Sequence, residues 1–241
     1  MCSEMRTAAT DHRVIGKGAL IGLVTVAGVG YHRFIRPRML RWGISEEDAR
    51  QPLPGDERVP NPLPGNNSTH AIPINAPPSA VWPWIVQIGH NRAGWYSHDW
   101  VERPFGIRYA EGRSATRIHP EFQDLRAGDE IPYSPFNALP VVALEPERYL
   151  IIGKSVAWVL QDLRGGRTRL IVRTRGYGWF KALFRKIPAL SELGAVIDYV
   201  IGEPLHHYME KGMCTGIAER AERTRRRDGR SRRTTQAACE P

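Results

Sequence analysis

The sequence has few cysteines and none of the short motifs that mark the common catalytic folds. Its 241 residues include three cysteines, at positions 2, 214 and 239. Their number and spacing exclude a disulfide scaffold and leave no metal-ligand motif. The chain also contains no P-loop, dinucleotide-binding fingerprint, G-x-S-x-G elbow or H-E-x-x-H pair. These absences remove the usual nucleotide-dependent, serine-hydrolase and zinc-protease classes.

The composition is that of an ordinary globular protein, with 41% hydrophobic and 24% charged residues. It excludes a mainly disordered chain, a coiled coil and a polytopic membrane protein. The net charge of +9 lies at the two ends: residues 1–43 contribute +5, residues 219–241 contribute +4, and residues 44–218 carry 19 charges of each sign. A nucleic-acid-binding domain needs its positive charge on a structured face. Nucleic acid is therefore a disfavoured partner, and an anionic membrane surface fits the basic ends better.

Residues 14–31, VIGKGALIGLVTVAGVGY, contain a single charged side chain, that of Lys17. As a helix this run would be roughly 27 Å long, close to the bilayer core of about 30 Å. The alternatives are a secretory signal peptide and a buried soluble helix. No A-x-A cleavage site follows the run, and no polar stripe interrupts it, so we predict a transmembrane helix acting as a single-pass anchor. The Arg cluster after it favours a membrane protein whose body is cytoplasmic.

Around this span we expect an N-terminal tail at residues 1–13 and a juxtamembrane and Pro-rich linker at residues 32–67. The linker segment ARQPLPGDERVPNPLPGNN, residues 49–67, has five prolines and no apolar periodicity, which is typical of an extended chain.

Residues 68–223 show the pattern of an α+β domain. An alternating stretch at residues 69–75 predicts an opening strand, and Pro77 and Pro78 predict the start of a short amphipathic helix. Five more short strands are predicted at Glu130–Tyr133, Pro140–Leu144, Tyr149–Ile152, Ser155–Leu160 and Thr168–Arg175. Gly165-Gly166 fits a hairpin turn, and the alternate arginines of the last strand fit a face open to water.

Helical patterns follow at Trp179–Ile187 and Pro188–Ile201, with a break at Gly202-Glu203-Pro204. A last helix is predicted from Pro204 to about Arg223, because its apolar residues recur at three- and four-residue steps. Residues 224–241 have no such pattern and are predicted to be a disordered basic tail. A curved antiparallel sheet closed by one long C-terminal helix would leave a cavity between them, where a ligand would bind.

Several strings resemble the START-like helix-grip superfamily (SRPBCC), especially its bacterial polyketide cyclase/dehydrase-like members. They are INAPPSAVWPWIVQIG, GWYSHDWVE, HPEFQDLRAGDEI and GEPLHHYMEKGMCTGIAERAE, and the resemblance covers roughly residues 36–224. It implies the helix-grip fold, a curved antiparallel β-sheet wrapped around a long C-terminal helix. It implies a cavity rather than a particular reaction, because the superfamily includes lipid carriers, hormone receptors and cyclases.

The densest polar and aromatic cluster is GWYSHDW, residues 94–100. His98 and Asp99 could form an acid–base pair, with Tyr96 orienting a substrate oxygen. The structural alternative makes the aromatic residues anchors and Asp99 a cap or an ion-pair partner, and it is the favoured interpretation.

The other polar clusters favour structural roles. His119, Glu121 and Asp124 match no common metal spacing, and Pro120 is expected to begin a helical turn with acids at its start. His206 and His207 are adjacent, so on a helix they point about 100° apart and cannot share one metal. In the last helix, Glu210 and Lys211 are predicted to form an exposed pair of charges, and Cys214 is predicted to be a buried packing residue. No metal or cofactor is expected.

Aromatic and apolar side chains are the stronger ligand-binding candidates, because pockets for polycyclic molecules and lipids are lined this way. The candidates are Trp82, Tyr133, Phe136, Trp158, Tyr177, His206, Met209 and Met213.

The first hypothesis is therefore a membrane-anchored protein that binds a hydrophobic small molecule, such as a lipid, isoprenoid or polyketide. The second is a cyclase- or dehydratase-type enzyme that uses His98, Asp99 and Tyr96 in the same cavity. The third is an interaction protein at the membrane surface that uses its Arg-rich tail. The sequence leaves the ligand and the oligomeric state open.

Overall fold

The computed structural model describes residues 22–58, 66–153, 156–184 and 186–238, and the chain divides into two units, residues 1–40 and 41–241. In the first unit, residues 22–30 are α-helical, and a π-helical turn at Tyr31–Ile35 leads into helix α2, Arg36–Leu40. Across the described ranges no helix is both long and apolar enough to cross a membrane. Residues 14–21 of the predicted span lie outside those ranges, so the anchor stays a prediction.

The second unit is built on one six-stranded antiparallel sheet with the strand order β1-β6-β5-β4-β3-β2. All six strands were predicted; β4 has the predicted ends, and the ends of the other five differ by a few residues. Their bounds are β1 Asn66–Ile74, β2 Glu130–Ser134, β3 Asn137–Glu145, β4 Tyr149–Ile152, β5 Val156–Leu163 and β6 Arg167–Tyr177. Gly165 and Gly166 form the β5–β6 turn with positive φ angles of 83° and 66°, as the hairpin prediction requires.

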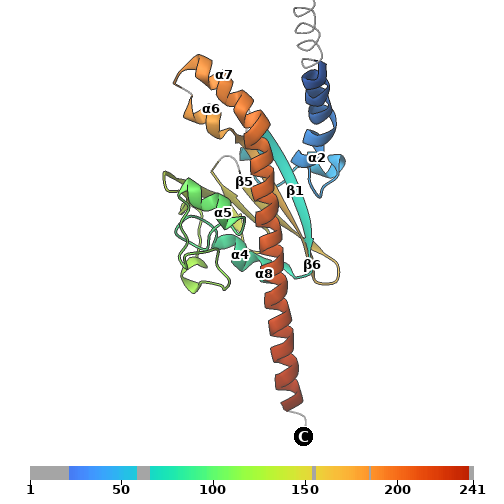
Figure 1. Ribbon diagram of the computed structural model, residues 1–241. Helices are drawn as coiled ribbons and strands as arrows, with labels where there is room; N and C mark the ends of the chain where they lie inside the picture. The colour runs from blue at the N-terminus through green and yellow to red at the C-terminus, as the bar shows by residue number, and fades with distance from the viewer. Residues whose placement is uncertain (1–21, 59–65, 154–155, 185, 239–241) are drawn as a thin grey trace, which may run out of the picture. The chain divides into compact units, whose positions relative to one another are not determined.

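Helices α4 and α8 of this unit pack on one face of the sheet (Figure 1). Helix α4, Pro78–Val86, begins at the predicted proline, and the long helix α8, Glu203–Ala238, contacts both α4 and β1. The smaller helices are α3 Glu46–Arg50, α5 Asp99–Glu102, α6 Trp179–Leu183 and α7 Pro188–Ile197. The α+β prediction, with a sheet crossed by a long C-terminal helix, is confirmed.

The hydrophobic core lies between the sheet and helices α4 and α8. Trp84 and Ile85 of α4 meet Trp158 of β5 there, and Cys214 and Ile217 come from α8. Cys214 is fully buried, as its predicted packing role requires, and burial raises the pKa of its thiol well above the usual range.

Helix α8 differs from the prediction at both ends. A π-helical turn at Asp198–Gly202 joins α7 to α8, so the chain does not break at Gly202-Glu203-Pro204. Pro204 is in the first turn of α8, where its missing N–H costs no helical hydrogen bond. At the other end the helix continues past Arg223 to Ala238, where a disordered tail was predicted. The tail has six arginines, which favour helix, and no proline before position 241.

The segment predicted as a linker is partly folded onto the outer face of the sheet. Leu53 is buried in a small cluster with Ala71 of β1, and Arg173 of β6 donates to the backbone carbonyls of Ala49 and Gln51. Arg173 also pairs with Asp56 and is only 5% exposed. The prediction that the arginines of β6 line a face open to water was therefore wrong at Arg173. Alternation correctly placed its side chain on the outer face, but residues 49–56 cover that face.

Candidate functional site

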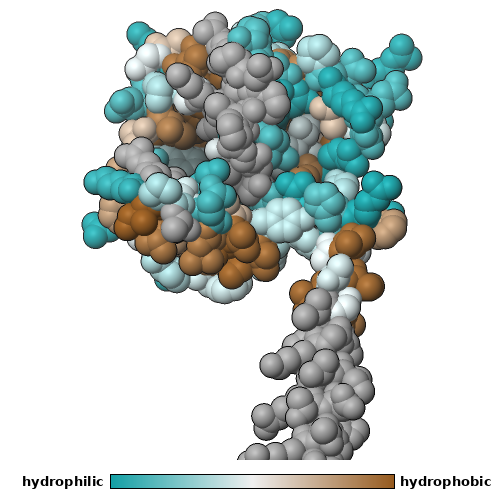
Figure 2. Space-filling view, turned by 90° about the horizontal axis from the view of Figure 1, so that it is seen from above, coloured by the Kyte–Doolittle hydropathy of each residue, from teal (hydrophilic) through white to brown (hydrophobic). Residues whose placement is uncertain are grey.

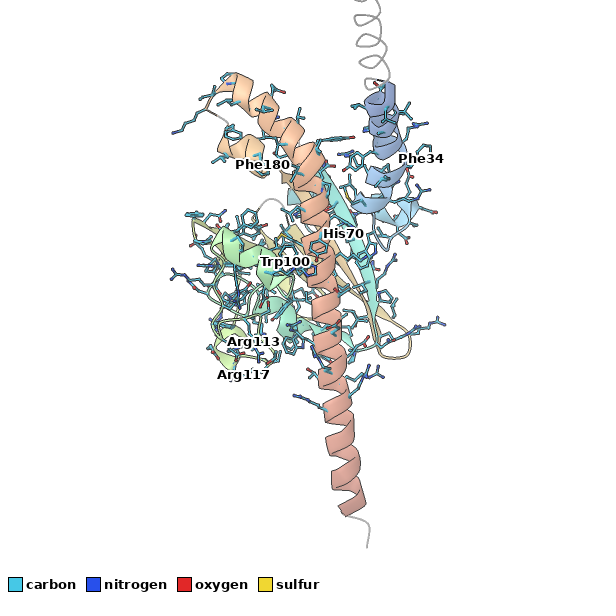
Figure 3. The ribbon with its side chains drawn as sticks, viewed as in Figure 1. Phe34, His70, Trp100, Arg113, Arg117 and Phe180 are labelled. Atoms are coloured by element: carbon cyan, nitrogen blue, oxygen red, sulfur yellow. The ribbon has the colours of Figure 1, made fainter. Side chains whose placement is uncertain are left out.

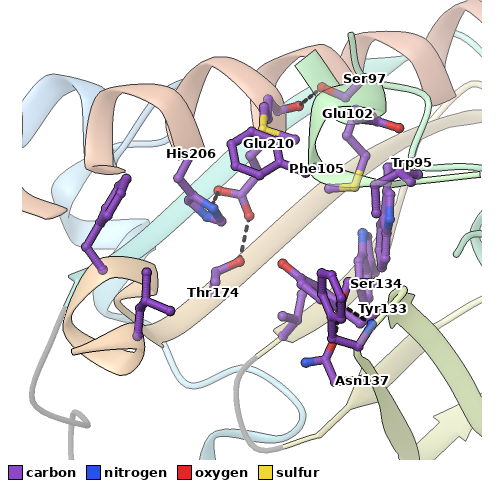
Figure 4. A pocket seen from close by; sticks show the side chains of 18 residues that line it. Trp95, Ser97, Glu102, Phe105, Tyr133, Ser134, Asn137, Thr174, His206 and Glu210 are labelled. Carbon is purple, nitrogen blue, oxygen red and sulfur yellow. Dashed lines mark hydrogen bonds and ion pairs between the residues drawn. The ribbon is translucent and has the colours of Figure 1, made fainter. Parts of the chain in front are cut away.

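A cavity of about 400 Å³ lies between the inner face of the sheet, the start of α8 and the loops around α5 and α6. Figure 4 shows the side chains around it. Its wall is mainly apolar and aromatic: Trp95, Phe105, Ile107, Tyr133, Phe136, Val156, Trp158, Phe180, Leu183, Met209 and Met213. The polar residues of the wall are Ser97, Glu102, Ser134, Asn137, Thr174, His206 and Glu210. A concave apolar wall with a few polar groups is the usual make-up of a small-molecule site.

The centre of the polar wall is Glu210, which projects from α8 toward strands β1 and β6. Thr174 donates to its Oε1 at 2.6 Å, and Ser68 donates to its Oε2 at 2.9 Å. The same Oε2 lies 2.7 Å from Nδ1 of His70 and 3.4 Å from Nε2 of His206. Figure 3 shows His70 beside α8.

These contacts keep Glu210 ionised. Burial by itself would raise its pKa, but the electrostatic interactions and hydrogen bonds with His206 and His70 outweigh burial and hold the pKa of Glu210 well below its usual range. His207 lies next in line, with Nδ1 3.3 Å from Nε2 of His70. Loss of solvation, helped by the charge of His70, lowers the pKa of His207 to about 4. The cluster is thus a buried carboxylate held by two hydroxyl groups and two imidazole rings.

Glu102, at the end of α5, is a second buried carboxyl group in the cavity wall. Glu102 has no exposed surface. The hydroxyl of Tyr109 donates a hydrogen bond to its Oε2 at 2.8 Å. Its Oε1 has no hydrogen-bond partner among the described residues. Burial raises the pKa of Glu102 to about 7; Asp99 adds to this, while the Tyr109 hydroxyl and the nearby amides of Ser97 and Trp95 oppose it.

The structure places six of the eight predicted ligand-binding residues at the wall of the cavity. They are Tyr133, Phe136, Trp158, His206, Met209 and Met213. Trp82 is not among the lining residues and packs, half-buried, against the core. The side chain of Tyr177 lies outside the described part of the chain. Tyr133 is shielded from water and lies near the charge of Glu210, and both effects raise its pKa to about 12.

The three residues of the enzyme hypothesis do not line the cavity. Tyr96 is buried, accepts a hydrogen bond from Gln87 at 2.7 Å, and has a φ of 59°. His98 stacks on Tyr208 with ring centroids 4.0 Å apart. Asp99 accepts a hydrogen bond from the hydroxyl of Ser114 at 2.8 Å. Each contact fits the structural alternative, in which these side chains anchor the loop before α5.

His119 is likewise occupied by protein partners. Its Nδ1 lies 3.0 Å from Glu121 and its Nε2 lies 3.2 Å from Glu111. A 3-10 turn begins at Pro120, as predicted. Within the described ranges, no group of three or more His, Cys, Asp or Glu side chains is placed to hold a metal ion.

Four residues of the site were missed and one was misplaced. Glu210 was predicted to form an exposed pair with Lys211, but it is 4% exposed. It lies one turn after His206 and one turn before Cys214, so helical spacing puts it on the buried stripe. That spacing could have revealed it. Ser68, His70, Thr174 and Glu102 carry no sequence signal of their own, because strand pairing brings the first three to Glu210 and the fold brings Glu102 of α5 to the cavity.

No family model matches the chain, and no curated protein matches its sequence. Three solved structures are similar at low identity. A conserved protein of unknown function from Enterococcus faecalis, EF2215, is 15% identical, with a TM-score of 0.32 over 60% of this chain and 83% of its own. The Polyketide_cyc-like protein Cgl2372 from Corynebacterium glutamicum is 15% identical, with a TM-score of 0.28 over 63% and 88%. The KanY protein is 16% identical, with a TM-score of 0.30 over 66% and 99%.

Proposed function

We propose that this protein binds a small, largely apolar molecule in the cavity between its sheet and α8. The observation that carries the proposal is the wall itself: about 400 Å³ enclosed mainly by aromatic and aliphatic side chains, with polar groups confined to a few positions. Such a wall would hold the body of the ligand by burial, and its polar groups would orient one end. An unfilled apolar space of this size costs stability, and a ligand would recover that loss.

The proposal is tested with the neutral apolar dye N-phenyl-1-naphthylamine, whose fluorescence rises in apolar surroundings. We expect saturable binding to the full chain. Met213→Trp fills the cavity from α8 and should weaken binding at least about tenfold. Glu219→Trp adds the same ring on the exposed side of the same helix and should leave binding unchanged.

Circular dichroism and the thermal midpoint show whether Met213→Trp stays folded. If it does not, Met213→Ala replaces it, since this enlarges the cavity and should retain the dye. Equal binding by folded wild type, Met213→Trp and Glu219→Trp would mean that the dye sits elsewhere, and the proposal would be wrong.

As a second proposal, we infer that the protein contacts a membrane. An exposed apolar surface supports this part of the first hypothesis. Leu183 and Phe136 line the cavity yet are 71% and 90% exposed, so they form its open edge. Leu193 and Val196 of α7 are also more than half exposed. Figure 2 shows apolar residues gathered in patches on the face seen there. Contiguous exposed apolar side chains are typical of surfaces that meet a membrane or a protein.

Vesicle flotation separates the two possible membrane contacts. Removing residues 1–31 tests the predicted anchor, and Leu183→Glu with Leu193→Glu tests the apolar edge. Loss of flotation in either variant supports membrane binding through that region. Full retention in a chain that carries both changes would contradict both. The Arg-rich tail remains a prediction, tested by removing residues 224–241 and measuring salt-dependent binding to vesicles and DNA.

A further inference from the structure

The charged groups of the cavity wall are all acids or histidines. The lining residues that titrate are Glu102, Tyr133, His206 and Glu210, and none of the lining residues is a lysine or an arginine. A pocket for fatty acids or phosphates would need a cation for the headgroup, because burying an unpaired anion costs several kcal/mol. This wall therefore disfavours an acidic ligand.

Glu210 has no need of a ligand. Both of its oxygens accept hydrogen bonds, from Thr174 and from Ser68, and ring nitrogens of His70 and His206 lie within 3.4 Å of Oε2. The carboxylate is held by residues of β1, β6 and α8 together, which makes it part of the framework of the wall.

Glu102 is different, because one of its carboxyl oxygens makes no hydrogen bond of normal geometry among the described residues, although the backbone amides of Ser97 and Trp95 lie near the carboxyl group and lower its pKa. Tyr109 occupies Oε2, and Oε1 has no hydrogen-bond partner in the described part of the chain. No ion pair to Glu102 is found there either, and its charged neighbour Asp99 is another acid. Buried polar atoms are nearly always paired in native proteins, and an exception calls for a missing partner. Glu102 lies in the cavity wall (Figure 4), so a bound molecule can provide that partner.

We propose that the ligand of this cavity carries a basic nitrogen, an amine on a hydrophobic body, whose N–H donates to Oε1 of Glu102. The proposal rests on the proposed function, since it assigns the polar end of a molecule that the apolar wall binds. The ammonium group supplies a positive charge beside Glu102, where no basic side chain among the described residues acts on the carboxyl group, and the charge-assisted hydrogen bond satisfies the unpartnered oxygen. The aromatic side chains Trp95 and Phe105 hold the hydrophobic body beside it.

Proton uptake follows from the same geometry. The groups that face Glu102 are Asp99 on its own helix, the Tyr109 hydroxyl, and across the cavity Tyr133 of β2 with His206 and Glu210 of α8. Without ligand, burial favours the protonated acid; an ammonium ion favours the carboxylate. Binding of the amine therefore releases a proton when the pH lies near the pKa of Glu102.

Three compounds with one ring system test the inference: 1-naphthylmethylamine, 1-naphthylmethanol and 1-naphthoic acid. Calorimetric titration of the full chain is carried out above the pKa of Glu102 and below that of the amine. We expect the amine to bind roughly ten- to hundredfold tighter than the alcohol, and the acid to bind weakest. Glu102→Gln should abolish the preference for the amine, whereas Glu130→Gln, an exposed carboxyl on β2, should preserve it.

The outcomes separate this inference from the proposed function. If the alcohol binds as tightly as the amine to wild type, the inference is wrong and cavity binding stands. If none of the three compounds binds, the proposed function is wrong and the inference falls with it. The ranking in wild type decides the matter even if Glu102→Gln is unstable. A second titration near pH 7, the pKa of Glu102, in buffers of different ionisation enthalpy reports the released proton, and its absence there would also overturn the inference.

Discussion

Glu210 of α8 and His70 of β1 lie 140 residues apart in the chain, yet Oε2 of the one is 2.7 Å from Nδ1 of the other, with both side chains buried. The contact ties the long helix to the edge strand at the wall of the cavity. Removing one partner from a buried, balanced pair costs more than the pair contributes, because the other charge is left alone.

We predict that Glu210→Gln destabilises the protein by about 3–5 kcal/mol. The amide keeps the shape of the side chain but loses the charge that interacts with His70 and His206. Urea unfolding at neutral pH measures the change. Glu219→Gln on the exposed side of α8 is the control and should cost no more than about 0.5 kcal/mol. A small loss at Glu210, equal to that of the control, would show that the cluster is neutral.

The pH dependence of Glu210 has a definite sign. Its pKa is lower in the folded chain than in the unfolded one, so the stability that it contributes is present above pH 4.5 and is lost as the pH falls through its folded pKa. Wild type should therefore lose stability faster than Glu210→Gln on acidification below pH 4.5. Unfolding curves at a series of acidic pH values check this.

Glu102 should act in the opposite direction. Its pKa rises from 4.5 to about 7 on folding, so its contribution is fully present below pH 4.5 and is lost as the pH rises through about 7. Glu102→Gln removes this loss and should raise the stability at alkaline pH by up to about 3 kcal/mol. Urea unfolding at about pH 5 and about pH 8 tests it. Glu130 is exposed, so Glu130→Gln should not alter how the free energy of unfolding changes with pH. The same pH dependence in Glu102→Gln as in wild type would contradict the prediction.

Arg173 should hold residues 49–56 against the outer face of the sheet. Its guanidinium pairs with Asp56 and donates to Ala49 and Gln51 while almost fully buried. Arg173→Ala should cost about 3 kcal/mol and expose this segment to hydrogen exchange. Arg169→Ala is the matched control on the same face of β6, since Arg169 is half-buried and pairs with Asp48 near the surface; it should cost at most about 1 kcal/mol. Equal exchange in both variants would refute the role of Arg173.

Gly216 should be required for the close approach of α8 to the loop before α5. A Cβ at this position would lie 2.2 Å from the carbonyl oxygen of Tyr96. Gly216→Ala should therefore destabilise the protein, although alanine favours helix by about 1 kcal/mol. At Gly212 the added atom would meet the side-chain ends of His98 and Ser97 at 2.8 and 3.0 Å, which can move. Thermal unfolding should show a smaller loss for Gly212→Ala; the reverse order would contradict this contact.

The local patterns of this chain predicted the elements well. Tyr149–Ile152 is a strand with the predicted ends, and the turn at Gly165-Gly166 and the helix start at Pro78 are where the sequence places them. Such features depend on the backbone preferences of a few neighbouring residues. The apolar candidates Trp158, Met209 and Met213 also reach the cavity, because burial and periodicity together indicate the inward face.

The polar site could not be predicted in the same way. Tyr96, His98 and Asp99 form the most conspicuous polar cluster in the sequence, yet all three are engaged in anchoring a loop. Glu210 is adjacent to Lys211 in the sequence, a pattern typical of two exposed charges. A charged side chain is buried only when partners from other elements compensate its loss of water, and that compensation is invisible along the chain.

The sequence by itself thus determined the strands, the helices and the apolar lining, because these follow from propensity and periodicity. Only the tertiary structure decided that Glu210 is balanced by His70 and His206 and that Glu102 faces the cavity with one oxygen unpaired. It also decided that residues 49–56 cover Arg173. Each of these depends on contacts between segments far apart in the chain, where distance and solvent exclusion set the energies of charges.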